Sequence, residues 1–288
     1  MEGGRTIRVS PAQDGLRLDV VIARECRISR GYARRLLAQG VARIGGRVAP
    51  KGTFVRCGEE ISVGEFRHPD RGPRPDATLS LPILAESYGL VAVDKPAGLP
   101  TAPLDFDETR TALGCVLAMR PAIVGIGDGG LQSGLVHRLD TGTSGVLVFA
   151  TCEAAWQRAR VAFATRRVRK VYVAQVHGRF EATECCALRL AQRGDHVAVV
   201  DHGGRSSLTT IEPLRPGDRI SLVRVRPHTG TRHQIRATLA HLGHPIVGDG
   251  LYGSSIEVGR HLLHAASIGI GRFEACSPVP EAILEEAG

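Results

Sequence analysis

The sequence predicts an α+β fold, in which a small basic N-terminal module precedes a larger domain. From about residue 80 onward, short apolar runs of strand composition alternate with glycine-rich turns and a few amphipathic helical stretches. Residues 1–64 contain 12 basic and 6 acidic residues, so this segment carries +6 of the chain's formal net charge of +8. Such an imbalance favours a polyanionic partner, either nucleic acid or a membrane surface.

Two helices are expected at the start of the N-terminal module, which spans residues 1–65. Leu18, Val21 and Ile22 recur at the spacing of one helix face. Ser29 is a suitable N-cap for a second helix, whose apolar face would be Leu36 and Leu37. A glycine at position 40 suits the residue that follows a helix.

Short strands are expected to complete the module. Residues 41–44 have strand composition, Gly45-Gly46 suits a tight turn, and residues 47–48 would form the return strand. Residues 66–79 are rich in proline and charge, which predicts a linker to a domain spanning 80–288.

The larger domain contains several segments whose type can be predicted, although the pattern does not determine how they are connected in a sheet. We expect strands at residues 90–93, 145–150, 170–176 and 219–226, and helices at 154–164 and 233–242.

Several function classes are disfavoured by the sequence. Seven cysteines without Cys-x-x-Cys spacing argue against a disulfide framework and a thiolate zinc site. The glycine-rich stretches lack the spacing of nucleotide-binding loops. No apolar signal core or membrane-length run occurs, so a cytoplasmic protein without a membrane partner is expected. Four histidines leave a metal-dependent hydrolase as a weaker alternative: His228, His233, His241 and His244.

A polar loop between two apolar runs concentrates ionisable and hydroxyl groups. It reads His137-Arg138-Leu139-Asp140-Thr141-Gly142-Thr143-Ser144-Gly145. Loops that core strands hold in place commonly carry catalytic groups. An aspartate in such a loop is nevertheless more often a turn former or a cap. Composition alone therefore makes Asp140 only an acidic loop residue.

This loop matches the signature His-Arg-Leu-Asp-x-x-Thr-Ser-Gly of the RluA family of RNA pseudouridine synthases at every signature position. Further blocks similar to those of the family follow the same order along the chain, at residues 93–98, 170–178, 233–236, 242–249, 251–253 and 263–265. The resemblance covers about residues 80–280. It implies a mixed, largely antiparallel central sheet and the isomerisation of uridine to pseudouridine in RNA, without a cofactor or a metal.

The resemblance also implies roles for individual residues. Asp140 would be the catalytic carboxylate, acting at the ribose either as a nucleophile or by removing a proton. Arg236 would be its counter-ion. Tyr172 would pack against the target base and stand where it could assist proton transfer, with Ile235 as an apolar wall. Arg138 would enter the space that the flipped base leaves, or steady the phosphates of that nucleotide.

Two further residues of these blocks are expected to contact RNA. These are His137 and Lys95, and for Lys95 the alternative is support of its own loop. One departure from the family pattern occurs at Thr229-Gly230-Thr231-Arg232, where the arginine is displaced by one position. This displacement puts in doubt the local contact that the usual arginine makes.

The N-terminal module resembles the RNA-binding module called S4-like, which a small-subunit ribosomal protein shares with many RNA-modifying enzymes. The match rests on Ser29-Arg30 and on Gln39-Gly40-Val41 ahead of the Gly45-Gly46 turn. Residues three and four apart are neighbours on a helix, so three arginines on one side of the second helix are expected to bind RNA. They are Arg30, Arg34 and Arg35. The alternative is an arginine-rich solvated helix pair.

The expected partner is therefore structured RNA, bound by a monomer. Large-subunit ribosomal RNA is the first candidate, because family members with such a module often act there, and transfer RNA is the second. The alternative function is a non-catalytic RNA-binding factor for ribosome assembly, built on a synthase scaffold.

Overall fold

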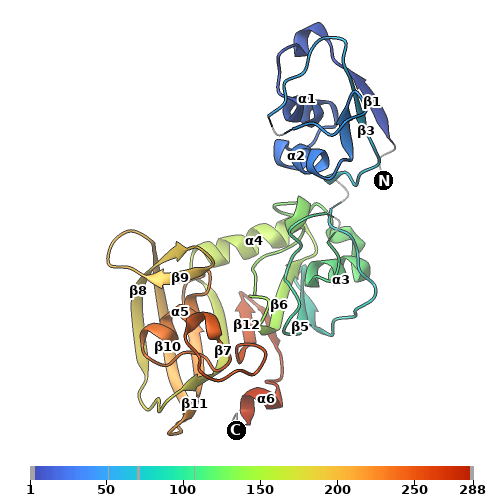
Figure 1. Ribbon diagram of the computed structural model, residues 1–288. Helices are drawn as coiled ribbons and strands as arrows, with labels where there is room; N and C mark the ends of the chain where they lie inside the picture. Colours follow the sequence, from blue (N-terminus) through green and yellow to red (C-terminus); the bar gives the residue numbers. More distant parts are fainter. Residues whose placement is uncertain (1–3, 51, 70–71, 107, 286–288) are drawn as a thin grey trace. The chain divides into compact units, whose positions relative to one another are not determined.

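The structure, a computed structural model, describes residues 4–50, 52–69, 72–106 and 108–285. The chain forms two compact units, Met1–Gly72 and Pro73–Gly288, which are described separately (Figure 1). The division falls inside the segment 66–79 that composition predicts as a linker. Both ends of this segment are packed: the Phe66 ring lies 6.2 Å from the Tyr32 ring in the first unit, and Asp76 accepts a hydrogen bond from the Arg110 amide in the second.

In its described residues, the N-terminal unit has two α-helices and a three-stranded antiparallel sheet of order β1-β3-β2. Its elements are β1 (Arg5–Arg8), η1 (Pro11–Gln13), α1 (Leu18–Glu25), α2 (Arg30–Ala38), β2 (Ala42–Ile44) and β3 (Glu60–Val63). Both predicted helices are confirmed. Ser29 caps α2 by accepting a hydrogen bond from the Tyr32 amide at 3.1 Å, and Gly40 follows the helix with a φ of 70°.

The predicted return strand at residues 47–48 is wrong. Arg47 forms a single bridge with Ile44, and the partner of β2 is β3. The two glycines at 45 and 46 do close a turn, but Val48 beyond it is 53% exposed. Pairing with β3 instead brings the fully buried Ile61 into the core, where apolar burial stabilises the sheet.

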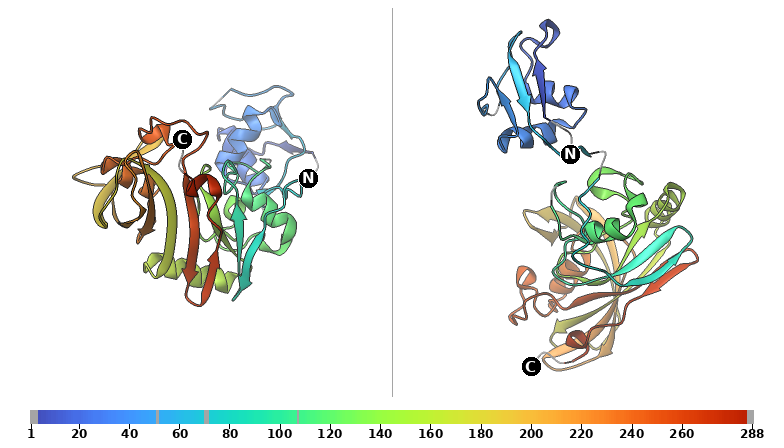
Figure 2. Two further views of the ribbon diagram at one scale, coloured as in Figure 1. Left: turned by 90° about the horizontal axis from the view of Figure 1, so that it is seen from below. Right: turned by 90° about the vertical axis from the view of Figure 1, so that its right-hand side faces the viewer.

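The second unit is built on a ten-stranded mixed sheet of order β4-β5-β6-β12-β7-β11-β10-β8-β9, with β13 paired to β12. Figure 2 shows the strands of this unit from two further sides. Its strands are β4 (Ile83–Ser87), β5 (Leu90–Lys95), β6 (Ser144–Ala150), β7 (Val168–His177), β8 (Glu184–Arg193), β9 (His196–Val199), β10 (Arg205–Arg215), β11 (Ile220–Pro227), β12 (Leu263–Ile270) and β13 (Phe273–Cys276). The strand pairs between described residues are antiparallel, apart from the parallel pair β6–β12. This arrangement confirms the α+β class and the mixed, largely antiparallel sheet.

Helices cover both faces of this sheet. They are α3 (Ala112–Met119), α4 (Glu153–Ala164), α5 (Gln234–His241) and α6 (Glu281–Leu284), together with the short turns η3 (Pro121–Ile123), η4 (Gly130–Gln132) and η5 (Gly250–Tyr252). The predicted strands at 90–93, 145–150, 170–176 and 219–226 and the predicted helices at 154–164 and 233–242 all occur, as β5, β6, β7, β11, α4 and α5.

Strands β5 and β6 are buried on both faces, which explains why residues 90–93 and 146–150 are all apolar. Val91 and Leu147 belong to the core cluster under α3, whereas Ala92 and Val148 belong to the cluster under α4. Successive side chains of a strand point to opposite faces, so each strand supplies both clusters. The start of β6 is thereby held between two packed layers.

Helix α5 packs against the other half of the sheet, where Ile235 and Leu239 join buried residues of β7, β10 and β11. Tyr172 of β7 packs against this cluster and also against the cluster under α3. The parallel pairing of β6 with β12 sets Ser144 opposite His264. The loop before β6, the start of α5 and the segment before β12 therefore converge on one region.

Two further observations concern the cysteines and the length of the helices. All seven cysteines are unpaired. Among the residues that the structure describes, none of the helices has the length and apolar character needed to cross a bilayer.

Candidate active site

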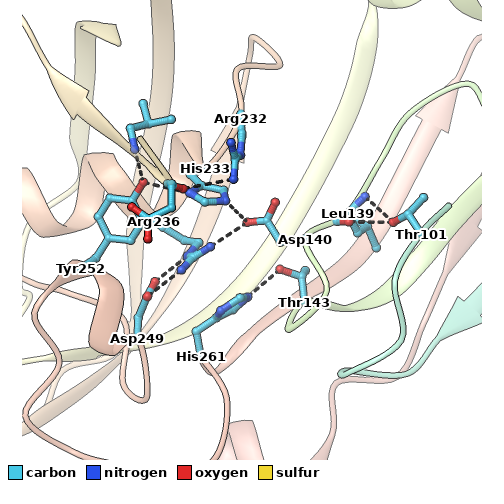
Figure 3. A network of polar contacts seen from close by, with 12 residues as sticks. Thr101, Leu139, Asp140, Thr143, Arg232, His233, Arg236, Asp249, Tyr252 and His261 are labelled. Atoms are coloured by element: carbon cyan, nitrogen blue, oxygen red, sulfur yellow. Dashed lines mark hydrogen bonds and ion pairs between the residues drawn. The ribbon is translucent and has the colours of Figure 1, made fainter. Parts of the chain in front are cut away.

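Asp140 lies in a tight turn that several contacts hold in place (Figure 3). The Thr143 amide donates to the Asp140 carbonyl at 3.0 Å, which closes the turn. Before it, the Thr101 hydroxyl donates to the Leu139 carbonyl at 2.7 Å. After it, the Thr143 hydroxyl lies 2.9 Å from Nε2 of His261. The backbone of Asp140 is thus fixed on both sides by residues distant in the sequence.

Gly142 in this turn lies directly against His261. A Cβ atom added at Gly142 would come within 2.7 Å of Cε1 of the imidazole ring. Burial lowers the pKa of His261 to about 4, so the ring stays neutral near neutral pH. The close approach of the turn to this ring therefore requires glycine.

Lys95 supports the same turn from below the surface. Its side chain is fully buried, and its amine donates to the carbonyls of Pro96, Leu99 and Thr141 at 2.9, 2.8 and 3.2 Å. Burial lowers the pKa of Lys95 to about 8, against the opposing influence of the Asp140 carboxylate. A fully buried amine with three carbonyl partners supports the alternative, in which Lys95 holds its own loop, and its contact with RNA stays a prediction.

The Asp140 carboxylate pairs with Arg236 of α5. Nη1 of Arg236 lies 3.2 Å from Oδ2 of Asp140, and the aspartate side chain is 29% exposed. The same guanidinium grips Asp249 in a bidentate pair, with Nε–Oδ2 at 2.6 Å and Nη2–Oδ1 at 2.8 Å. Asp249 is 2% exposed. The buried Asp249 therefore orients the arginine that meets Asp140.

The two carboxylates of Asp249 and Asp140 keep Arg236 charged. Burial alone would lower the pKa of Arg236, but the carboxylates of Asp249 and Asp140 raise it above its usual value. Two carboxylates thus share one cation, and Asp140 keeps an accessible, ionisable side chain.

Tyr172 and Ile235 line the apolar side of the site. Burial first, and then the charge of Asp140, raises the pKa of Tyr172 well above its usual range, so the phenol stays protonated. Ile235 is 6% exposed and lies in the cluster against which Tyr172 packs. The structure thus brings Asp140, Tyr172 and Arg236 into one site.

The two remaining residues of the signature that were expected to contact RNA differ in their surroundings. The Arg138 side chain is exposed beside the Asp140 turn. His137 is half-buried: its Nε2 accepts a hydrogen bond from the Val148 amide at 3.1 Å, and its ring stacks on Phe163 at 5.5 Å. His137 therefore ties the loop to β6 and α4, and its contact with RNA stays a prediction.

The predicted RNA-binding arginines of the N-terminal unit gather around a buried carboxylate. Arg30 and Arg34 lie 3.2 and 2.7 Å from Oδ2 of Asp19, which is 4% exposed. Both arginine side chains are about half exposed. Arg35 instead lies over the Tyr32 ring, 4.8 Å from its centroid. Asp19 orders two of the three arginines while leaving their outer faces open to solvent.

The displaced arginine has a partner in the protein. Arg232 donates to the Asp195 carbonyl at 3.1 Å, in the hairpin between β8 and β9. The histidines that suggested a metal site have separate partners: His228 meets Thr210 and His244 meets the His177 carbonyl. In the described ranges, no group of three or more His, Cys, Asp or Glu residues is arranged to hold a metal ion.

Some residues of the site were not singled out by sequence reasoning. Asp249 and Tyr252 lay within blocks that resemble the family, but their contact with Arg236 was not predictable from spacing. His261 and Asp19 carried no signal that would have identified them. The sequence marks His233 only as a candidate metal ligand or motif residue, whereas its Nε2 lies 3.8 Å from Oδ2 of Asp140.

A partly exposed carboxylate beside a buried arginine, a protonated tyrosine and an apolar wall make a site suited to a planar base and its sugar. A family model described as RNA pseudouridylate synthase matches residues 89–241. This match does not extend over the N-terminal unit. The chain belongs to this family of RNA-modifying enzymes.

Individual relatives agree with the family match. An uncharacterized RNA pseudouridine synthase from Chloroflexus aurantiacus is 33% identical over 297 residues, covering 96% of this chain and 90% of the relative. The ribosomal large subunit pseudouridine synthase D of Zymomonas mobilis is 28% identical, covering 88% and 86%. The solved structure of human RNA pseudouridylate synthase domain containing 1 aligns with a TM-score of 0.57 and 27% identity, covering 71% of this chain and 86% of that one.

Proposed function

We propose that the protein converts uridine to pseudouridine in large-subunit ribosomal RNA, with Asp140 as the catalytic carboxylate. The observation that carries the assignment is the 3.2 Å pair between Asp140 and Arg236, in which Arg236 is itself held by the buried Asp249. A preorganised cation holds the carboxylate in one orientation, without further reorganisation during the reaction.

The reaction is an isomerisation, so the RNA has the same composition before and after it. The bond between ribose C1′ and N1 of uracil breaks, and a bond between C1′ and C5 forms. The proton on C5 leaves, and N1 gains a proton. Asp140 acts at the ribose, either by attacking C1′ or by removing a ribose proton, and its ionised form is required in both routes.

Tyr172 and Ile235 receive the target base in this proposal. The aromatic face of Tyr172 supports the uracil ring, and stacking of a base on an aromatic side chain contributes about 1–3 kcal/mol. The phenol stays protonated, so its hydroxyl is a hydrogen-bond donor to the detached base while the base turns.

A uridine within structured RNA must leave its stack before it reaches Asp140. The exposed Arg138 lies two residues before Asp140. We assign it to the flipped nucleotide, where its guanidinium fills the vacated space or binds the flanking phosphates.

The N-terminal unit, an S4-like module in this proposal, docks on structured RNA through Arg30, Arg34 and Arg35. The half-exposed guanidinium groups of Arg30 and Arg34 retain donors for phosphate beyond those used on Asp19. Large-subunit ribosomal RNA is the favoured substrate because a relative that covers most of the chain is a ribosomal large subunit pseudouridine synthase.

Replacement of Asp140 by Asn tests the catalytic assignment. RNA labelled with tritium at uridine C5 releases the label when the new C–C bond forms, so release measures turnover directly. The Asp140→Asn variant should release no tritium and should still bind the RNA. A variant with the same substitution at the exposed Asp218 serves as the control and should keep full activity.

Two outcomes would overturn parts of the proposal. Undiminished tritium release by Asp140→Asn would remove Asp140 from the chemistry, and wild-type protein without any release would favour a non-catalytic assembly factor. Pseudouridine mapping of total RNA with and without the gene identifies the substrate, and loss of sites in transfer RNA alone would exclude the ribosomal assignment.

A further inference from the structure

His233 stands at the start of α5 in an unusual backbone conformation. Its φ is 52° and its ψ is 19°, in the left-handed region that residues other than glycine rarely adopt. Such conformations persist where the surrounding structure imposes them, often at functional sites. Here the conformation directs the imidazole toward Asp140 (Figure 3), with Nε2 at 3.8 Å from Oδ2.

The other ring nitrogen of His233 is held by Tyr252. Nδ1 lies 3.0 Å from the tyrosine hydroxyl, and this hydroxyl accepts a hydrogen bond from the Val197 amide at 2.8 Å. Because the Val197 N–H supplies one proton to the oxygen, the hydroxyl's own proton is free to point at Nδ1. A neutral His233 then carries its proton on Nε2, which faces Asp140.

The charge states of both rings agree with this arrangement. Burial lowers the pKa of His233, with Arg236 and Arg232 acting in the same sense and Asp140 and Asp249 opposing it. Burial also raises the pKa of Tyr252, which keeps its hydroxyl proton. The imidazole is therefore neutral near neutral pH and has one N–H to donate.

His233 and Arg236 both approach the same oxygen of the Asp140 carboxylate. Arg236 and His233 face Oδ2, and no described residue hydrogen-bonds to Oδ1. Tyr252 also touches both supports, since the Arg236 guanidinium lies 4.9 Å from the centroid of its ring. Oδ2 thus faces two side chains of the protein, and in the proposed reaction Oδ1 is the oxygen that faces the ribose.

We infer that His233 is a second positioning residue for Asp140, a neutral N–H donor to Oδ2 whose tautomer Tyr252 sets through Val197. The inference rests on the proposed role of Asp140. The separation of 3.8 Å shortens to a hydrogen bond when substrate fills the site, as contacts in catalytic centres commonly do. Donation by a neutral ring stabilises the ionised carboxylate without transferring a proton to it.

Substitutions at position 233 distinguish a donor from a merely space-filling residue. His233→Met removes the N–H and should lower kcat about 10- to 100-fold, the effect of one hydrogen bond to a charged group. His233→Gln places an amide N–H near the position of Nε2 and should restore most of the activity. His202→Met, at an exposed histidine, is the matched control and should leave kcat unchanged.

Tyr252→Phe tests the tautomer assignment. It should lower kcat about tenfold in the wild-type background and cause no further loss beside His233→Gln, because an amide has no tautomer to set. In the ¹⁵N spectrum of the wild-type protein, Nε2 of His233 should be protonated and Nδ1 unprotonated.

Each result decides the inference. Unchanged kcat in His233→Met, equal losses in His233→Met and His233→Gln, or a proton found on Nδ1 would overturn it. If His233→Met does not fold, the comparison of Tyr252→Phe in the two backgrounds and the spectrum of the wild-type protein still decide. Activity in Asp140→Asn would instead refute the proposed function, so the two failures are distinguishable.

Discussion

The two units of the protein contain opposite versions of one motif, a buried carboxylate paired with arginine. In the N-terminal unit, three arginines surround Asp19, and Arg30 and Arg34 are about half exposed. In the second unit, two carboxylates share Arg236, whose side chain is only 9% exposed. The first cluster has an excess of positive charge at the surface, and the second has an excess of negative charge inside a site.

The difference shows how one kind of ion pair can either order a charged surface or position a single group in a site. Asp19 neutralises part of the repulsion between arginines and orders them, so that they can face a polyanion. Arg236 is buried and committed to Asp249, so its remaining donor has one defined direction. Surface arginines thus favour contact with many phosphates, whereas the buried arginine positions a single carboxylate.

The largest effect is expected from breaking the buried cluster. Arg236→Met leaves the charge of Asp249 buried without its partner, which should lower the free energy of unfolding by about 3–5 kcal/mol. It also removes the cation beside Asp140, so tritium release should fall below about one thousandth of the wild-type rate. The single tryptophan, Trp156 of α4, reports unfolding of this unit in urea.

The matched control for this prediction is Arg169→Met, because the pair of Arg169 with Glu274 is 63% and 70% exposed on its two sides. Its unfolding free energy should change by less than about 1 kcal/mol. Equal destabilisation by the two variants would mean that burial does not distinguish the two kinds of pair.

An intermediate effect is expected from Asp19→Asn. Burial would raise the pKa of Asp19, but hydrogen bonds from Arg34, Arg17 and Arg30 lower it to about 2. Because the folded pKa lies below the unfolded value, the contribution to stability is present above pH 4 and is lost as pH falls towards 2. Allowing for the exposure of the arginines, this contribution is about 1–2 kcal/mol.

Amide hydrogen exchange of α1 and α2 measures this stability within the intact chain. Wild-type protection should decline between pH 4 and pH 2, and the Asp19→Asn variant should start lower and lack that decline. Unfolding followed by Trp156 should be unaffected. A wild-type-like pH dependence in the variant would show that Asp19 is not the titrating group.

The smallest effect is expected from the surface arginines themselves. The double variant Arg30→Ala/Arg34→Ala should weaken RNA binding and reduce the slope of log K against log salt by about 1 for each phosphate that the protein no longer neutralises. The kcat at saturating RNA should stay unchanged, in contrast to Arg236→Met. An unaltered salt slope would support the alternative of a solvated helix pair.

Much of the local structure was predictable because it depends on neighbouring residues. The cap at Ser29, the glycine after α2 and the apolar runs of β5 and β6 act over a few residues, and the structure confirms them. The return strand at 47–48 failed because its competitor, β3, lies more than ten residues further along the chain. Pattern alone does not weigh a near partner against a distant one.

The same distinction between local pattern and long-range contact applies to the residues of the site. The sequence by itself determined the family, through the complete signature around Asp140, and with it the expectation that Arg236 would be the counter-ion of that carboxylate and that Tyr172 would pack against the target base. Only the tertiary structure decided that Asp249 grips Arg236, that His233 faces Asp140 and that Lys95 is buried beneath the turn. The contacts of Asp140 with α5 join residues 96 positions apart, and they depend on the parallel pairing of β6 with β12 and on the packing of α5. A motif records which residues are present, whereas the partner of each side chain is set by how the sheet closes around it.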